Sequence, residues 1–313
     1  MSTALVGLVS LAMSFAGEGP ARASTLAAAT LQSPPPISGR AAAAEVTGET
    51  LVQTDIVPLA AAMEPGKPFP IGVRYKVAPK WHLYWRNPGE SGAPLGIEWV
   101  VPEGFKVGQL EYPRPLIIEH PGEVTIGYES ELVLRTTLTP PADRPLPDLI
   151  SVEAKLDWLV CSNKCLMGRR TSKVTLTKSG MTPFAPSGEY PTTLEKLGLV
   201  AMVNDDSLII RAGALSSSPG SVSRGSSIRF VPDLTPGVTY GATVPPAVVV
   251  GDATELTIPL TVKPQNALGE PLRAAGLVII TLPDGKPAGC AEIAFPLGLP
   301  QTPSGATPAK EQR

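Results

Sequence analysis

The sequence predicts an all-β protein made of antiparallel sandwiches. Pro and Gly are abundant, with 36 and 30 among 313 residues, and both interrupt long helices. Short strand-like runs recur at regular spacing between turn signals, a pattern typical of β-sandwiches. The length is sufficient for two ordinary domains. We therefore expect two sandwich domains joined by a short helical connector.

The first expected domain spans residues 47–182 and follows a leader (1–23) and a linker (24–46). The linker is rich in Ala, Ser and Pro without an apolar period, so we expect it to be disordered. Six strands are predicted in the domain: Leu51–Ala60, Phe69–Val77, Ile97–Val101, Val124–Leu138, Val152–Val160 and Lys173–Leu176.

A connector and a second domain are expected to follow. Within the connector, 183–206, Thr192-Thr193-Leu194-Glu195 fits a capping box and predicts a helix with Leu197, Val200 and Met202 on its apolar face. The second domain, 207–299, precedes a tail, 300–313, that we expect to be disordered. Its predicted strands are Ser207–Ala212, Ser227–Val231, Ala247–Val250, Leu256–Val262, Gly276–Leu282 and Ala291–Pro296.

Charge and apolar content restrict the function classes. A formal net charge of −2 gives no basic field for nucleic acid. Beyond the leader, no run reaches the length of about 18 apolar residues typical of a membrane span. The leader has an apolar run, Ala4–Ala16, and a small-residue cleavage pattern, Ala21-Arg22-Ala23, but no positive charge at its start. These features predict export to the periplasm or beyond; the alternative is an apolar leader on a cytosolic protein.

Cys161 and Cys165 are the candidate reactive residues. A straight strand would hold them about 13 Å apart, and a disulfide needs Cα atoms at about 4.4–6.8 Å. The chain must therefore turn between them, through a three-residue hairpin loop or one helical turn, and the flanking apolar runs favour the hairpin. A bond that closes so short a loop gains little chain entropy, so we expect an exposed, easily reduced disulfide.

Neighbouring residues can tune or shield such a pair. Lys164 lies inside the loop, where its charge would lower a thiol pKa, and Asn163 suits the turn. The tryptophans all lie in the first expected domain, either in its core or as a wall around the cysteines. Period-2 alternation places Trp158 and Val160 on one strand face, with Leu159 and Cys161 on the other.

No cofactor or metal site is expected. The sequence has no phosphate-binding loop and no dinucleotide-binding glycine pattern. Zinc would need two ligands besides the cysteines, and the two histidines, His82 and His120, are far apart in sequence. His82 is interpreted as a strand-end residue. The remaining metal alternative is a copper carrier that holds Cu(I) with the two cysteines and Met167.

Three segments together resemble the N-terminal periplasmic domain of the disulfide-interchange reductase DsbD, in the branch that contains the copper-sensitivity suppressor ScsB. They are Trp81–Gly92 (WHLYWRNPGESG), Trp99 with Pro102–Phe105, and Asp157–Cys165. The second expected domain resembles the companion β domain of that branch more weakly. The carrying segments there are Ile228–Pro232 and Pro236–Val238.

The resemblance implies an immunoglobulin-like sandwich whose cysteine pair relays electrons by thiol–disulfide exchange. In the family, a membrane domain reduces the pair, which then reduces periplasmic thioredoxin-fold proteins. Cys161 and Cys165 carry over directly, and Cys161 is taken as the partner-facing sulfur. Tyr84, Trp85, Asn87 and Glu90 are supporting candidates, because we infer that the aromatic segment 81–85 and the 87–92 loop cover the cysteines and limit access by small oxidants.

The sequence departs from the family in two respects. Three residues separate the cysteines, fewer than the five in the best-known member. The family's membrane and C-terminal thioredoxin-like domains are absent from this sequence, so we expect electrons from a separate membrane protein of the DsbD type. The main alternative is a non-catalytic binding module with a structural disulfide. Cys290, the third cysteine, is expected to be a buried free thiol.

Overall fold

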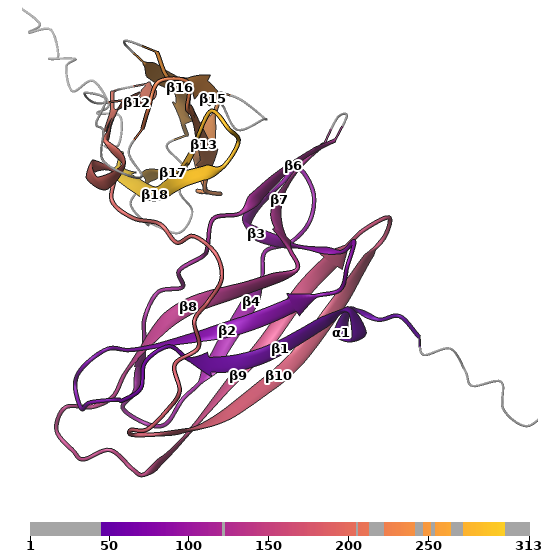
Figure 1. Ribbon diagram of the computed structural model, residues 1–313, viewed down its shortest axis with the longest axis vertical. Helices are drawn as coiled ribbons and strands as arrows, with labels where there is room; N and C mark the ends of the chain where they lie inside the picture. Colours follow the sequence, from indigo (N-terminus) through magenta and orange to yellow (C-terminus); the bar gives the residue numbers. More distant parts are fainter. Residues whose placement is uncertain are drawn as a thin grey trace, which may run out of the picture. The chain divides into compact units, whose positions relative to one another are not determined.

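The computed structural model describes residues 45–120, 123–204, 206–212, 222–241, 247–251, 254–263 and 272–297 (Figure 1). Within these ranges the chain is almost entirely β and is built from antiparallel sheets, as predicted. The leader, most of the linker before Glu45 and the tail lie outside the described residues. No described helix has the length and apolar character needed to cross a bilayer.

The strands from Val52 to Thr177 form two antiparallel sheets that enclose one core. In the first sheet the order is β1-β2-β8-β5, formed by Val52–Pro58, Phe69–Val77, Glu131–Thr139 and Lys106–Val107. In the second it is β10-β9-β3-β7-β6, formed by Cys165–Thr177, Leu149–Cys161, His82–Gly89, Glu123–Glu129 and Leu116–His120. Strand β4, Gly96–Val100, also pairs with β9, and a short helix α1, Gly48–Leu51, precedes β1.

The alternation of inward and outward side chains along the strands explains how this core forms. Strand β2 directs Phe69, Ile71, Val73 and Tyr75 inward, and none of them is more than 2% exposed. Each large apolar side chain buried in this way contributes about 1.5–3 kcal/mol relative to an exposed one. The predicted strand Phe69–Val77 is therefore confirmed at both ends.

The strands after the connector form two further four-stranded sheets. One has the order β11-β12-β16-β14, formed by Leu199–Val203, Ser207–Ala212, Glu255–Val262 and Val238–Tyr240. The other has the order β15-β13-β17-β18, formed by Ala247–Val249, Ser227–Pro232, Arg273–Thr281 and Pro287–Pro296. A second apolar core lies between them. The division at residues 182 and 207 into separate domains remains a prediction.

Two expected elements differ from the structure. The run Val124–Leu138 is not one strand, because Ser130 has φ 64° and separates β7 from β8, which belong to different sheets. The connector helix is only a single 3-10 turn, η1, Glu195–Leu197. It ends at Gly198, whose φ of 71° is left-handed, so Val200 and Met202 lie in strand β11.

Candidate redox site

The two cysteines meet at the tip of a long hairpin made by β9 and β10. Cys161 ends β9, Cys165 begins β10, and the two residues lie directly opposite each other in the strand register. Their sulfurs form a disulfide of 2.04 Å, and their Cα atoms are 4.1 Å apart. The predicted hairpin is confirmed, and the helical turn that remained open from the sequence is not formed.

The two cysteines differ in exposure. Cys161 is 2% exposed, whereas Cys165 and the loop residues Ser162, Asn163 and Lys164 are exposed. The loop is closed by a hydrogen bond from the Ser162 amide to the Lys164 carbonyl, and the Ser162 hydroxyl donates to Oδ1 of Asn163 at 3.1 Å. A visiting thiol can therefore approach Cys165, and burial opposes the expectation that Cys161 faces the partner.

Strand β3 lies beside the buried cysteine. His82 is directly opposite Cys161 in the register between β3 and β9, and its Nε2 atom lies 3.3 Å from the Tyr84 hydroxyl. The two rings meet edge to face, with centroids 5.1 Å apart. Tyr84 is 2% exposed, and burial raises the pKa of its phenol. Sequence reasoning gave His82 no role, because the register that brings it to Cys161 is not visible in the sequence.

The loop after β3 packs on Tyr84. Gly92 has φ 103°, and a Cβ atom at this position would overlap the Tyr84 ring. The Ser91 hydroxyl donates to Glu123 on β7 and so ties the loop to the sheet. The loop thus covers Tyr84, a neighbour of His82; its predicted role as a cover over the cysteines remains untested.

Two of the predicted supporting tryptophans belong to the core. Trp158 is 2% exposed, donates from Nε1 to the Gly48 carbonyl at 3.2 Å and meets Tyr75 edge to face. Trp85 is 1% exposed and belongs to the same core cluster. Of the two interpretations of the aromatic residues, core packing is therefore the one that fits Trp158 and Trp85.

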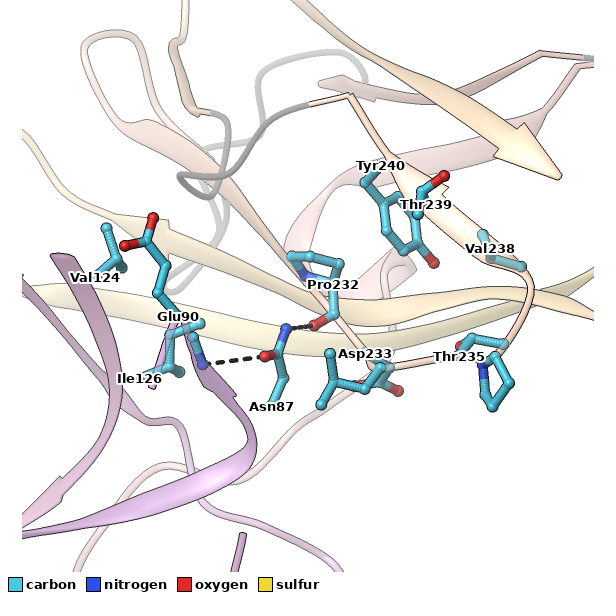
Figure 2. A pocket seen from close by; sticks show the side chains of 13 residues that line it. Asn87, Glu90, Val124, Ile126, Pro232, Asp233, Thr235, Val238, Thr239 and Tyr240 are labelled. Atoms are coloured by element: carbon cyan, nitrogen blue, oxygen red, sulfur yellow. Dashed lines mark hydrogen bonds between the residues drawn. The ribbon is translucent and has the colours of Figure 1, made fainter. Parts of the chain in front are cut away.

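Asn87 and Glu90 lie at the other end of β3. Asn87 is five residues from His82, about 16 Å along an extended strand. Its Nδ2 donates to the Pro232 carbonyl at 2.6 Å, and its Oδ1 accepts from the Gly89 amide at 3.1 Å. Both residues line a pocket of about 470 Å³ together with Tyr240 and other residues of the 232–240 segment (Figure 2). A contact across 145 positions ties Asn87 to Pro232, and Glu90 lines the same pocket, so the described contacts of these two residues lie away from the cysteines. Their supporting role in the exchange remains a prediction.

Arg86 adds charge to this second location. Its guanidinium donates to Asp233 and to Glu292, each at 2.6 Å, and lies 4.6 Å from the ring centroid of Trp85. Burial lowers the pKa of Arg86, but the two carboxylates outweigh this effect and raise it overall. Strand β3 therefore carries the cysteine neighbours at its start and an ion-pair cluster further along.

Cys290 is a free thiol with no exposed surface, as predicted. It lies in β18 opposite Ile279 of β17, and burial raises its pKa to about 12. Such a thiol contains almost no thiolate at neutral pH, so it is a poor nucleophile. Among the residues that the structure describes, no group of three His, Cys, Asp or Glu side chains is arranged to hold a metal ion.

A family of known proteins matches the segment that contains the two cysteines. Residues 49–177 match the family "Thiol:disulfide interchange protein DsbD, N-terminal". No curated protein matches the chain closely enough to count as a relative.

Three solved structures are similar in part. The crystal structure of the N-terminal periplasmic domain of ScsB from Proteus mirabilis has 19% identity and a TM-score of 0.49, covering 80% of this chain and 94% of that one. The major pilin subunit BcpA of Bacillus cereus has 10% identity and a TM-score of 0.25, covering 79% of this chain and 66% of its own. The CupB6 tip adhesin of Pseudomonas aeruginosa also has 10% identity, with a TM-score of 0.19, 80% of this chain and 99% of its own.

Proposed function

Because residues 49–177 match the N-terminal domain family of the interchange protein DsbD, we propose that this chain is an exported carrier of electrons. It passes them through the Cys161–Cys165 pair to or from thioredoxin-fold proteins of the periplasm. The observation that carries this proposal is a disulfide at a hairpin tip in which one cysteine, Cys165, is exposed. A separate membrane protein of the DsbD type is the proposed electron donor.

The exposure of Cys165 and the burial of Cys161 support one order of exchange. A thiolate of the reduced partner protein attacks Sγ of Cys165 and forms a mixed disulfide with it. Cys161 leaves with the electron pair of the broken S–S bond. The second thiolate of the same partner then attacks the mixed disulfide and releases Cys165. The partner has become a disulfide, and this chain holds two electrons and two protons as a dithiol. The same steps in reverse order reduce the next protein. In this proposal the partner-facing residue is Cys165 and not Cys161, the residue expected from the sequence.

The surface beside Cys165 suits a protein partner. Met167 follows on the same strand face and is 64% exposed, and the partly buried Leu159 lies opposite it on β9. Exposed apolar side chains next to a reactive group are typical of docking surfaces. The flexible thioether of Met167 can adapt to partners of different shape.

Trapping tests the proposal directly. In Cys161→Ser, Cys165 remains as an exposed nucleophile without its resolving partner, so it should accumulate a mixed disulfide with an oxidised thioredoxin-fold protein. Cys165→Ser is the matched variant and should accumulate at least about tenfold less, because its remaining thiol is buried. Adducts are counted by non-reducing gel and mass spectrometry. Absence of exchange in the wild-type protein would contradict the function, and equal trapping by both variants would contradict the order.

The reduction potential separates this function from a structural disulfide. A carrier must cycle against its partners, whereas a value below about −300 mV is typical of a bond that resists physiological reduction. Equilibration with glutathione or dithiothreitol buffers measures it. A value in the structural range would favour the non-catalytic binding module.

Copper binding is a second candidate function because Met167 shares a strand face with both cysteines. Two thiolates and a thioether are soft ligands that suit Cu(I). Stoichiometric Cu(I) binding by the reduced protein, weakened in Met167→Ala, would support this function. No binding would dismiss it.

A further inference from the structure

Four side chains form a single row across the second sheet of the first sandwich. In the strand register Cys165 lies opposite Cys161, Cys161 opposite His82, and His82 opposite Glu129 on β7. Residues directly opposite in antiparallel strands project to the same face, with Cβ atoms about 4.5–5.5 Å apart. The imidazole is thus the side chain next to the Cys161 sulfur on the side away from the disulfide partner.

Burial along the row makes this neighbour important. Cys165 and Glu129 are exposed at the two ends, His82 is partly buried, and Cys161 is 2% exposed. When the disulfide opens by attack at Cys165, the negative charge develops on the sulfur of the buried cysteine, Cys161. A thiolate without solvent is costly unless a proton or a cation compensates it.

We propose that His82 is the proton-transfer partner of Cys161; this inference rests on the proposed function and assigns a residue to it. During reduction, the Cys161 sulfur leaves with the S–S electron pair and takes a proton from the His82 imidazolium, giving a neutral thiol and a neutral imidazole. Solvent then returns a proton to the imidazole. During oxidation, His82 accepts the Cys161 proton as this sulfur attacks the mixed disulfide at Cys165 and expels the partner thiolate.

The groups around His82 fit this role. Tyr84, on the same strand, places its hydroxyl 3.3 Å from Nε2 and helps to hold the ring. Glu129 lies opposite His82 on β7 and Cys161 lies opposite it on β9, while Cys165 lies one strand farther away on β10. Glu129 thus places a carboxylate on the side of His82 opposite the sulfur, and an imidazole in its protonated form can deliver a proton to the leaving group.

The first test uses dithiothreitol as the attacking thiol, so that no protein partner is needed. We expect His82→Gln to be reduced at least about tenfold more slowly than the wild type at pH 7, and its pH–rate profile to lose the inflection near pH 6–7 that an imidazole gives. Tyr84→Phe keeps the ring packing and should keep the inflection. Equal rates and profiles in His82→Gln and the wild type would overturn the proposal.

The second test needs no substitution at His82 and is independent of folding defects. The chain has only two histidines, so His120→Gln leaves one imidazole to follow by NMR in untagged protein. We expect the His82 signals to show one titration step in the disulfide form. In the dithiol form a second inflection should appear at the pH where Cys161 ionises, as the absorbance of the thiolate reports. A His82 titration that is identical in both forms would overturn the proposal.

These outcomes also separate this inference from the proposed function. A wild-type protein that shows the coupled His82 titration but no exchange with thioredoxin-fold proteins would refute the carrier function and leave the proton-transfer pair intact. A wild-type protein that exchanges with thioredoxin-fold proteins but shows no coupled His82 titration would support the carrier function and refute the proton-transfer pair.

Discussion

The two sandwiches hold their sulfur atoms in opposite environments. In the first, the Cys161–Cys165 disulfide lies at a hairpin tip, where Cys165 is exposed. In the second, Cys290 lies within strand β18 with no exposed surface, and burial raises its pKa to about 12. The same residue type is therefore suited to exchange in one sandwich and to packing in the other.

Sheet architecture explains the difference. Strands β9 and β10 each have 13 residues and bring the cysteines to the end of the sheet. Strand β17, which pairs with β18, is buried almost continuously, as expected for a strand covered on both faces. Its Leu277 and Ile279 join Cys290 in the cluster of the first core, whereas Val278 and Ile280 belong to the second core. What distinguishes a reactive cysteine here is its position in the sheet.

Thiol reactivity should show the largest contrast. In the fully reduced protein at pH 8, iodoacetamide should modify Cys165 quickly and Cys290 slower by about three orders of magnitude, because a pKa near 12 leaves so little thiolate compared with an ordinary thiol near 8.5. Mass spectrometry of peptides from timed samples measures each site. Rapid modification of Cys290 in the folded protein would break the comparison.

The same shift predicts a pH dependence of stability. The folded protein keeps the Cys290 proton up to about pH 12, whereas in the unfolded chain this thiol loses it near pH 9. Above pH 9 the unfolded state therefore binds fewer protons, so the contribution of Cys290 to the free energy of unfolding falls as pH rises. The free energy of unfolding in urea is measured against pH for the wild type and for Cys290→Ala. The difference between the two proteins isolates the contribution of Cys290 from that of the buried tyrosines. A difference between the two proteins that does not change from pH 8 to pH 11 would contradict the shift.

A matched pair of glycines tests whether each sulfur depends on its own sandwich. A Cβ atom on Gly168 of β10 would overlap the indole of Trp158, and one on Gly276 of β17 would overlap the Phe230 ring and the Val231 carbonyl. We expect Gly168→Ala and Gly276→Ala each to cost about 1–3 kcal/mol in urea unfolding, because both sites are fully packed. Thr171→Ala, at an exposed position of β10, is the control and should change little.

The strands that each glycine substitution destabilises provide a sharper test of this comparison. Gly168 is three residues from Cys165, so Gly168→Ala should increase amide hydrogen exchange in β9 and β10 and alter the rate of disulfide reduction by dithiothreitol. Gly276→Ala should increase exchange in β13, β17 and β18 and leave that rate unchanged. If both variants altered disulfide reduction equally, the two sandwiches would not be independent in this respect.

Local patterns in the sequence were sufficient to predict many strands and the cysteine hairpin. Phe69–Val77 and Ser207–Ala212 are confirmed at both ends, because alternation and flanking turns are local signals. His82 is a strand-end residue as interpreted, since β3 begins there, but no range was predicted for this strand, because Asn87-Pro88-Gly89 is typical of a turn. The break at Ser130 was also missed, because a single left-handed residue leaves little trace in composition.

The surroundings of the site depend on information that one sequence does not contain. The Cys161–Cys165 pair follows from chain geometry over five residues. His82 reaches Cys161 only through the register of β3 against β9, and Asn87 reaches Pro232 only through packing across the chain. Residues near the motif in the family's linear pattern, such as Glu90, were therefore placed beside the cysteines although they line a pocket elsewhere.

The smallest expected effect concerns Lys164, the cation between the two cysteines. Its side chain lies on the exposed loop, where water and salt screen a unit charge at short range to about 1 kcal/mol or less. Lys164→Ala should therefore slow reduction by dithiothreitol no more than about fivefold at low ionic strength, and the difference should vanish near 0.5 M salt. Lys173→Ala, which removes a positive charge on β10 farther from the tip together with its ion pair to Glu153, is the control for net charge. A larger, salt-independent loss in Lys164→Ala would mean that the loop cation compensates the Cys161 thiolate, leaving less of that role to the imidazole of His82.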